Sequence, residues 1–123
     1  MLRDIKEMLY TAAYHPAEIE RILDPANPAF IKFDAELGYE LKDYIFRDGM
    51  EGTLSAYTYE LHGGHRKIIN YADQPCRINT YGDSFTQCAQ VSDGETWQEV
   101  LAAHFREPIR NFGVGGYGVY QAY

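Results

Sequence analysis

Hydrophobic residues recur along the chain in three successive patterns. In residues 1–23 they lie three and four positions apart, which favours helix. These positions are Leu2, Ile5, Leu9, Ala12 and Ala13, followed after Pro16 by Ile19, Ile22 and Leu23. Two prolines in the stretch 24–28 interrupt the pattern and predict a linker.

The middle of the chain, from Phe30 to Tyr71, carries residues typical of strands. The run 54–61 is rich in Tyr and Thr, the run 66–71 contains two isoleucines, and Gly63-Gly64 lies between them. Two β-prone runs around a glycine pair predict a hairpin.

Two histidines flank that glycine pair, so a metal site has to be weighed there. His62 and His65 could share one ion across a turn. A structural zinc needs four ligands and a catalytic zinc usually three, and no further ligand has recognisable spacing. We therefore expect solvated turn histidines and no metal.

From residue 76 onwards the pattern predicts strand, helix and strand. A short strand at 77–81 is followed by Ser92 and Glu95 at capping-box spacing, which predicts a helix ending at about Phe105. Its expected buried residues are Trp97, Val100, Leu101 and Phe105. Pro108 ends the helix, and 109–112 is the next strand. Short connections of this kind predict a parallel pair with a right-handed crossover.

Composition limits the classes of function. The chain has 123 residues and a formal charge of −7, which argues against a nucleic-acid binder. Neither a signal peptide nor a membrane span is seen, so we expect a cytoplasmic protein. Cys76 and Cys88 are too few for a disulfide scaffold and are expected to be reduced thiols that pack as small hydrophobes. No cofactor is expected.

Two glycine-containing turns follow the predicted parallel strands. Ser84 lies on a turn after Gly82, and the loop 113–118 follows the second strand. Loops that follow neighbouring parallel strands emerge at the same edge of the sheet, so both turns are expected to lie close together. A serine beside backbone N–H donors is an arrangement suited to acyl transfer.

The second loop also admits another interpretation. Gly113, Gly115 and Gly118 have the G-x-G-x-x-G spacing of a dinucleotide-binding turn. That fingerprint normally follows the first strand of its domain and requires an acidic residue about twenty positions later. A noncatalytic α/β module that binds a nucleotide through this loop therefore stays open as an alternative.

The segments Gly82-Asp83-Ser84-Phe85 and Asn111–Gly118 together resemble the first two sequence blocks of the SGNH (GDSL-type) hydrolases. The resemblance covers residues 76–123. It implies a flavodoxin-like α/β/α sandwich, incomplete here, and hydrolysis of ester substrates such as acylated carbohydrates or lipids. By the resemblance Ser84 is the nucleophile, Gly116 contributes an oxyanion-hole N–H, and Asp83 supports the turn.

The family's remaining catalytic groups, an Asn and an Asp/His pair, follow the second block. The sequence ends five residues after Gly118, so this chain alone is expected to be inactive, and marginally stable or associating. His104 is expected to be a solvated helical residue, not the base. We divide the chain into an accessory helix and hairpin region (1–75) and the start of a hydrolase domain (76–123). The accessory tyrosines fit either alternating strand positions or a carbohydrate-binding face.

Overall fold

The computed structural model describes residues 31–46, 52–59 and 63–122, and the separate positions 16, 17, 20 and 24. The helical pattern predicted over 1–23 and the linker predicted at 24–28 lie outside the described residues apart from those positions. His62 also lies outside them. Everything below concerns the described part.

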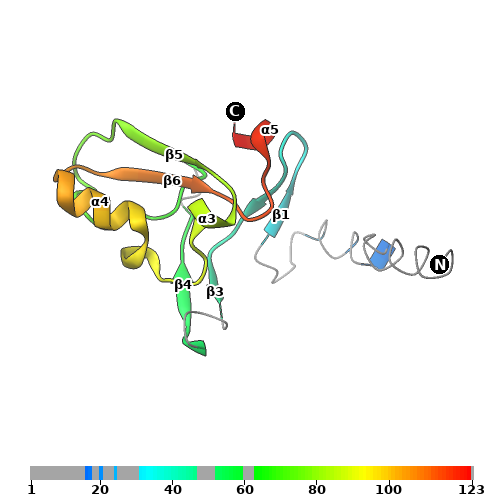
Figure 1. Cartoon of the computed structure of the whole chain (residues 1–123). Coiled ribbons are helices and arrows are strands. Elements are labelled where there is room, and N and C mark those ends of the chain that lie inside the picture. Colours follow the sequence, from blue (N-terminus) through cyan, green and yellow to red (C-terminus); the bar gives the residue numbers. More distant parts are fainter. Residues whose placement is uncertain are drawn as a thin grey trace, which may run out of the picture.

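The described strands form three two-stranded sheets (Figure 1). Two are antiparallel: β1 (Ile31–Asp34) with β2 (Gly38–Leu41), and β3 (Tyr44–Phe46) with β4 (Ser55–Tyr57). The third is parallel and pairs β5 (Ile78–Gly82) with β6 (Ile109–Gly113). The helices are α3 (Ser84–Gln87), the 3₁₀ turn η2 (Asp93–Glu95), α4 (Trp97–Phe105) and α5 (Val119–Ala122). This mixture confirms a general α/β class, whereas the flavodoxin-like sandwich stays a prediction.

The unit from β5 to β6 has the predicted order of strand, helix and parallel strand. Gly82 pairs with Gly113 at the carboxyl end of the sheet, so both loops leave from one edge. The capping box is present, with the Glu95 carboxylate accepting the Ser92 N–H at 2.8 Å, but it opens η2. Thr96 then caps α4, and Arg106 ends it in the left-handed conformation. Local capping and turn chemistry therefore specify this unit.

The hairpin predicted around Gly63-Gly64 is confirmed only in part. Among the described residues the two runs meet in one antiparallel bridge, Tyr59 to Arg66, beside a bond from the Lys67 N–H to the Thr58 carbonyl at 2.7 Å, whereas strand β4 pairs with β3. The reason lies in α4, because the Glu99 carboxylate accepts the N–H groups of Ile69 and Asn70 at 2.9 and 2.8 Å. A side chain thus satisfies the backbone donors that a strand would have paired.

The buried face predicted for α4 is wrong. Val100 is 65% exposed and Phe105 53% exposed, and Trp97 and Leu101 are exposed as well. The helix buries Gln98, Glu99 and Ala102 instead. Ala102 is small enough for close approach to the sheet. Gln98 Nε2 donates to the Thr80 hydroxyl and the Thr86 carbonyl, and the Glu99 carboxylate accepts the bonds from residues 69 and 70. Specific polar contacts, and not the spacing of apolar residues, therefore determine which face of α4 is buried.

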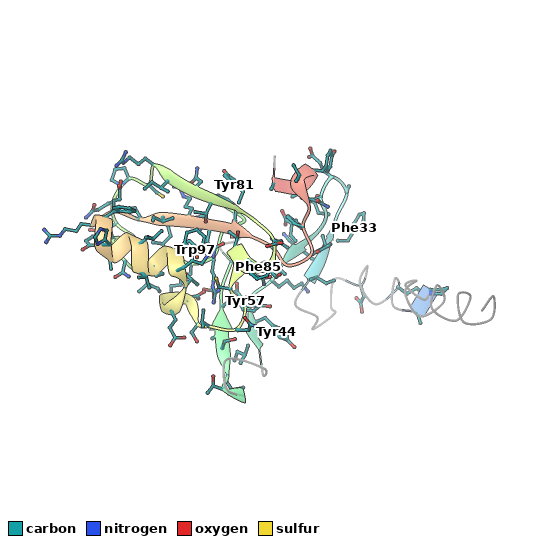
Figure 2. The ribbon with its side chains drawn as sticks, in the orientation of Figure 1. Phe33, Tyr44, Tyr57, Tyr81, Phe85 and Trp97 are labelled. Carbon is teal, nitrogen blue, oxygen red and sulfur yellow. The ribbon has the colours of Figure 1, made fainter. Side chains whose placement is uncertain are left out.

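The hydrophobic core joins the antiparallel strands to the loop after β6. Its buried members are Leu41, Tyr57, Tyr59 and Val114, and Ile31, Tyr39, Tyr44, Ala89 and Tyr117 pack against them. Tyr44 and Tyr57 lie on neighbouring strands (Figure 2), and the centroids of their rings are 6.1 Å apart. Because the cluster draws on both sides of residue 75, the region 31–59 helps to position the candidate site. The domain division at residue 75 stays a prediction.

No helix in the described part of the chain is long and apolar enough to cross a membrane. The two cysteines are both free and half-buried. The Cys76 thiol lies 3.2 Å from the carbonyl oxygen of Ile78 and 3.3 Å from that of Pro108, so it packs between the two segments of the sheet.

Candidate active site around Ser84

The candidate nucleophile occupies the first position of α3. Asp83 is the N-cap residue, and its carboxylate accepts the Phe85 N–H at 3.0 Å. Gly82 has φ +156°, and a Cβ there would overlap the Thr86 side chain. Ser84 is exposed, and its hydroxyl has no hydrogen-bond partner among the described residues. The turn therefore presents an accessible, unpaired hydroxyl.

The loop after β6 lies directly against this turn, as predicted. A Cβ on Gly115 would be 3.7 Å from Ser84 Cβ. A Cβ on Gly113 would overlap the backbone of Thr86 and Gln87, so only glycine permits this approach. The two turns, 31 positions apart in sequence, therefore form one surface at the carboxyl edge of β5 and β6 (Figure 1).

Amide side chains fix the two turns to each other. The Asn111 side chain donates to the Thr86 carbonyl at 2.8 Å and accepts the Gly113 N–H at 2.9 Å. The Gln87 side chain accepts the Gly115 N–H at 2.7 Å. From α4, Gln98 Nε2 donates to the same Thr86 carbonyl at 2.9 Å. Asn111 and Gln98 are 3% and 1% exposed, so these bonds are made away from solvent.

Almost every backbone N–H of the loop is already bonded within the chain. The N–H groups of Gly113 and Gly115 go to the amide side chains just described. Those of Val114 and Tyr117 donate to backbone carbonyls, and that of Gly118 donates to Gln121 Oε1 at 2.9 Å. The N–H of Gly116 is the exception and has no acceptor in the described part of the chain. Gly116 is also exposed and has φ +86°.

A buried arginine that the sequence did not single out holds the segment after α3. Arg66 is 2% exposed, and its guanidinium donates to the carbonyls of Gln87 at 2.7 Å, Cys88 at 2.8 Å and Val91. Its Nε forms an ion pair with Asp93 at 2.8 Å. Its backbone N–H donates to the Asn111 carbonyl of β6 at 2.8 Å. One residue thus ties the sheet to the segment that follows Ser84.

Nothing in the local sequence marks Arg66 for this role. It appears as one cation in a β-prone run, and the partners of its side chain lie 21 to 27 positions away. A basic residue there is equally compatible with a solvated strand face.

Of the two described histidines expected to be solvated, one is buried. His65 is 7% exposed, with Nδ1 2.8 Å from the Arg66 carbonyl oxygen and its ring edge-on to Phe112, so the solvated turn histidine predicted there is wrong. The turn packs against β6, which removes the ring from solvent. His104 is exposed on the last turn of α4, as expected. Within the described residues no group of three or more His, Cys, Asp or Glu could hold a metal ion.

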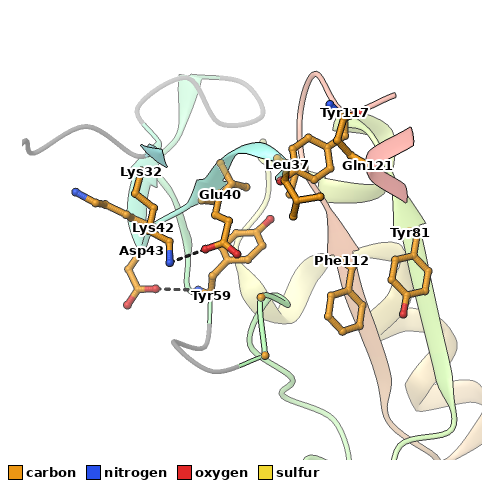
Figure 3. Close-up of a pocket in the computed structure, with 14 residues that line it drawn as sticks. Lys32, Leu37, Glu40, Lys42, Asp43, Tyr59, Tyr81, Phe112, Tyr117 and Gln121 are labelled. Atoms are coloured by element: carbon orange, nitrogen blue, oxygen red, sulfur yellow. Dashed lines mark hydrogen bonds and ion pairs between the residues drawn. The ribbon is translucent and has the colours of Figure 1, made fainter. Parts of the chain in front are cut away.

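A separate cavity of about 900 Å³ lies on the other face of the parallel sheet (Figure 3). Tyr81 and Phe112 stack there, with ring centroids 4.9 Å apart. They alternate with Thr80 and Asn111, which face α3 and α4. The β1–β2 hairpin supplies the opposite wall through Leu37 and its neighbours. Ser84 does not line this cavity, so the candidate nucleophile opens directly to solvent.

Tyrosines surround the loop on its hairpin side. The Tyr59 hydroxyl donates to the Gly113 carbonyl at 2.9 Å, and burial raises the pKa of Tyr59. Burial raises the pKa of Tyr57 and of Tyr117 to about 12, with the nearby Glu40 carboxylate adding to the shift at Tyr117. These hydroxyls therefore stay protonated, and Tyr59 stays a donor, at neutral pH.

Comparisons with protein-family models, with curated proteins and with solved structures found no match to this chain.

Proposed function

We propose that this chain carries the nucleophile turn and the backbone oxyanion donors of a serine ester hydrolase of SGNH type. Ser84 Oγ attacks the ester carbonyl carbon, and its proton passes to a base. The carbonyl oxygen becomes an oxyanion that accepts hydrogen bonds from the N–H groups of Ser84 and Gly116. Loss of the alcohol leaves an acyl-serine, which water hydrolyses. Acylated carbohydrates and lipids remain candidate substrates.

One observation carries this proposal: in the loop 113–118 only the Gly116 N–H has no acceptor among the described residues, and the loop lies beside Ser84. The Ser84 N–H is also without an acceptor in the described part, because it begins a helix whose Asp83 cap bonds the next residue. Two unpaired donors beside an unpaired hydroxyl are suited to holding a developing negative oxygen.

The same observation counts against the nucleotide alternative. A pyrophosphate cradle needs several N–H groups directed outward and a helix N-terminus behind them. Here the neighbouring N–H groups are bonded internally, and Gln121 occupies the Gly118 N–H at the start of α5. That helix spans only Val119–Ala122.

The described residues place no base at Ser84. His65 is held by the Arg66 carbonyl, and His104 lies at the far end of α4. Asp83 uses its carboxylate on the Phe85 N–H. A serine without its base keeps only a small residual activity, so we propose that residues outside the described part supply it.

The test uses the complete protein, so that the base is present, and combines hydrolysis of p-nitrophenyl acetate with covalent labelling by a fluorophosphonate, read by mass spectrometry. Ser84→Ala is expected to abolish both the label and the enzyme-dependent turnover. Ser92→Ala serves as the matched serine control and is expected to retain both, since its hydroxyl bonds the Ala56 N–H in a different region. Equal turnover in the wild type and Ser84→Ala would refute the nucleophile assignment.

A further inference from the structure

The β1–β2 hairpin contributes one side chain to the loop that carries the proposed oxyanion donor. Tyr39 lies in β2, and its hydroxyl donates a hydrogen bond to the Gly115 carbonyl oxygen at 2.5 Å. Tyr39 is itself held by Tyr117, whose hydroxyl donates to the Tyr39 carbonyl. The two rings meet edge to face with centroids 5.4 Å apart. Tyr39 is therefore a fixed donor.

The carbonyl that Tyr39 holds shares a peptide group with the Gly116 N–H. No cis peptide bond occurs among the described residues, so the C=O of Gly115 and the N–H of Gly116 point in opposite directions. A hydroxyl that fixes the carbonyl oxygen also fixes the N–H, which points away from Tyr39. The same loop lies beside Ser84, because a Cβ on Gly115 would be 3.7 Å from Ser84 Cβ.

We propose that Tyr39 is a positioning residue, which orients the Gly116 N–H for the oxyanion formed at Ser84. Hydrogen bonding to the carbonyl also polarises the amide and makes its N–H a stronger donor. Tyr39 touches no reacting atom and acts through the Gly115–Gly116 peptide. This inference rests on the proposed function.

The glycine at 116 fits the same arrangement. Its φ of +86° is unfavourable for other residues, and a Cβ there would lie 2.5 Å from Tyr39 Oη. A side chain at 116 would therefore displace the hydroxyl from the Gly115 carbonyl. The loop conformation and the tyrosine depend on each other.

The chain offers a matched control for removal of the Tyr39 hydroxyl. Tyr59 also donates its hydroxyl to a glycine carbonyl of this loop, that of Gly113, at 2.9 Å. The N–H in that peptide group belongs to Val114 and already bonds the Gly82 carbonyl at 3.0 Å. Tyr39→Phe and Tyr59→Phe thus each remove one bond of the same kind, but only Tyr39→Phe releases the proposed oxyanion donor.

The experiment measures kcat and KM of the complete protein for p-nitrophenyl acetate, and the Gly116 amide signal in the same protein labelled with ¹⁵N-glycine. In Tyr39→Phe we expect kcat to fall about tenfold with KM unchanged, since the donor acts on the transition state. The Gly116 amide is expected to shift and exchange faster with solvent. In Tyr59→Phe both kcat and the Gly116 signal are expected to stay near wild type.

The possible failures are distinguishable. If Ser84→Ala leaves turnover unchanged, the proposed function is wrong and the positioning role falls with it. If turnover depends on Ser84 but Tyr39→Phe matches Tyr59→Phe in kcat and in the Gly116 signal, only the inference about Tyr39 is overturned.

Discussion

The loop 113–118 is held on its two sides by different chemistry. Towards α3 the contacts come from neutral amides, Asn111 and Gln87, with the segment after α3 held by the buried cation Arg66. Towards the hairpins they come from the hydroxyls of Tyr39 and Tyr59. Amide side chains do not titrate, whereas a tyrosine hydroxyl can lose its proton in alkali. The amide contacts can therefore be removed only by substitution, and the hydroxyl contact of Tyr59 also by alkali, at a pH that burial raises.

The largest effect is expected on the α3 side from Arg66→Met. The change leaves Asp93 and three carbonyls without their buried donor, so the free energy of unfolding should fall by about 3–5 kcal/mol. Urea denaturation followed by circular dichroism measures it. Arg77→Met is the control, because its ion pair with Glu107 is exposed and its loss should change stability far less. Equal losses in both variants would contradict the proposed role of Arg66.

A smaller loss is expected from Asn111→Leu, which keeps approximate size but removes both amide contacts. The Gly113 N–H is then buried without an acceptor, and the free energy of unfolding should fall by about 1–3 kcal/mol. Asn79→Leu changes an exposed residue of the neighbouring strand and should stay within about 0.5 kcal/mol of wild type. Denaturant titration of the two variants separates a buried amide from an exposed one.

The tyrosine side predicts sensitivity to alkali. Burial raises the pKa of Tyr57 to about 12 in the folded chain, above the usual value of 10. The unfolded chain therefore loses this proton first, and stability present below pH 10 is lost as the pH rises towards about 12. Tyr57→Phe should flatten this dependence, measured as the free energy of unfolding against pH. Tyr120→Phe, at an exposed position, should leave the slope unchanged.

The smallest effect on stability is expected away from the loop 113–118, on the exposed face of α4. Val100 is 65% exposed, so Val100→Lys should change the free energy of unfolding by no more than about 0.5 kcal/mol. Ala102→Lys, two positions later on the buried face, should prevent cooperative folding. A thermal melt of each variant measures the difference in stability between the two. A large loss in Val100→Lys would show that the apolar face packs against something within the chain.

The sequence predicts the parallel unit well because its signals are local. The Ser92–Glu95 box, Pro108 and the glycines at strand ends each act within a few residues, and all are found in the structure. The closeness of the two glycine turns also follows from the topology alone. The closeness of the Ser84 turn and the loop 113–118 could therefore be predicted from the sequence.

The sequence pattern predicted neither the pairing of β3 with β4 nor the inner face of α4. The inner face depends on polar side chains that meet distant backbone groups, such as Glu99 with the N–H groups of Ile69 and Asn70. The hydrophobic periodicity predicts that Glu99 faces solvent. The fold shows instead that its carboxylate oxygens accept backbone hydrogen bonds. Tyr39 was missed for the same reason, because its partner lies 76 positions away.

The indole of Trp97 has a practical consequence. It is the only tryptophan in the chain, is partly exposed, and donates from Nε1 to the Phe85 carbonyl of α3 at 3.3 Å. Its fluorescence therefore senses the helix that begins with Ser84 with no competing emission from another indole. Displacement of α3, and the acylation of Ser84 that we propose, should therefore change this emission and can be followed in real time without a label.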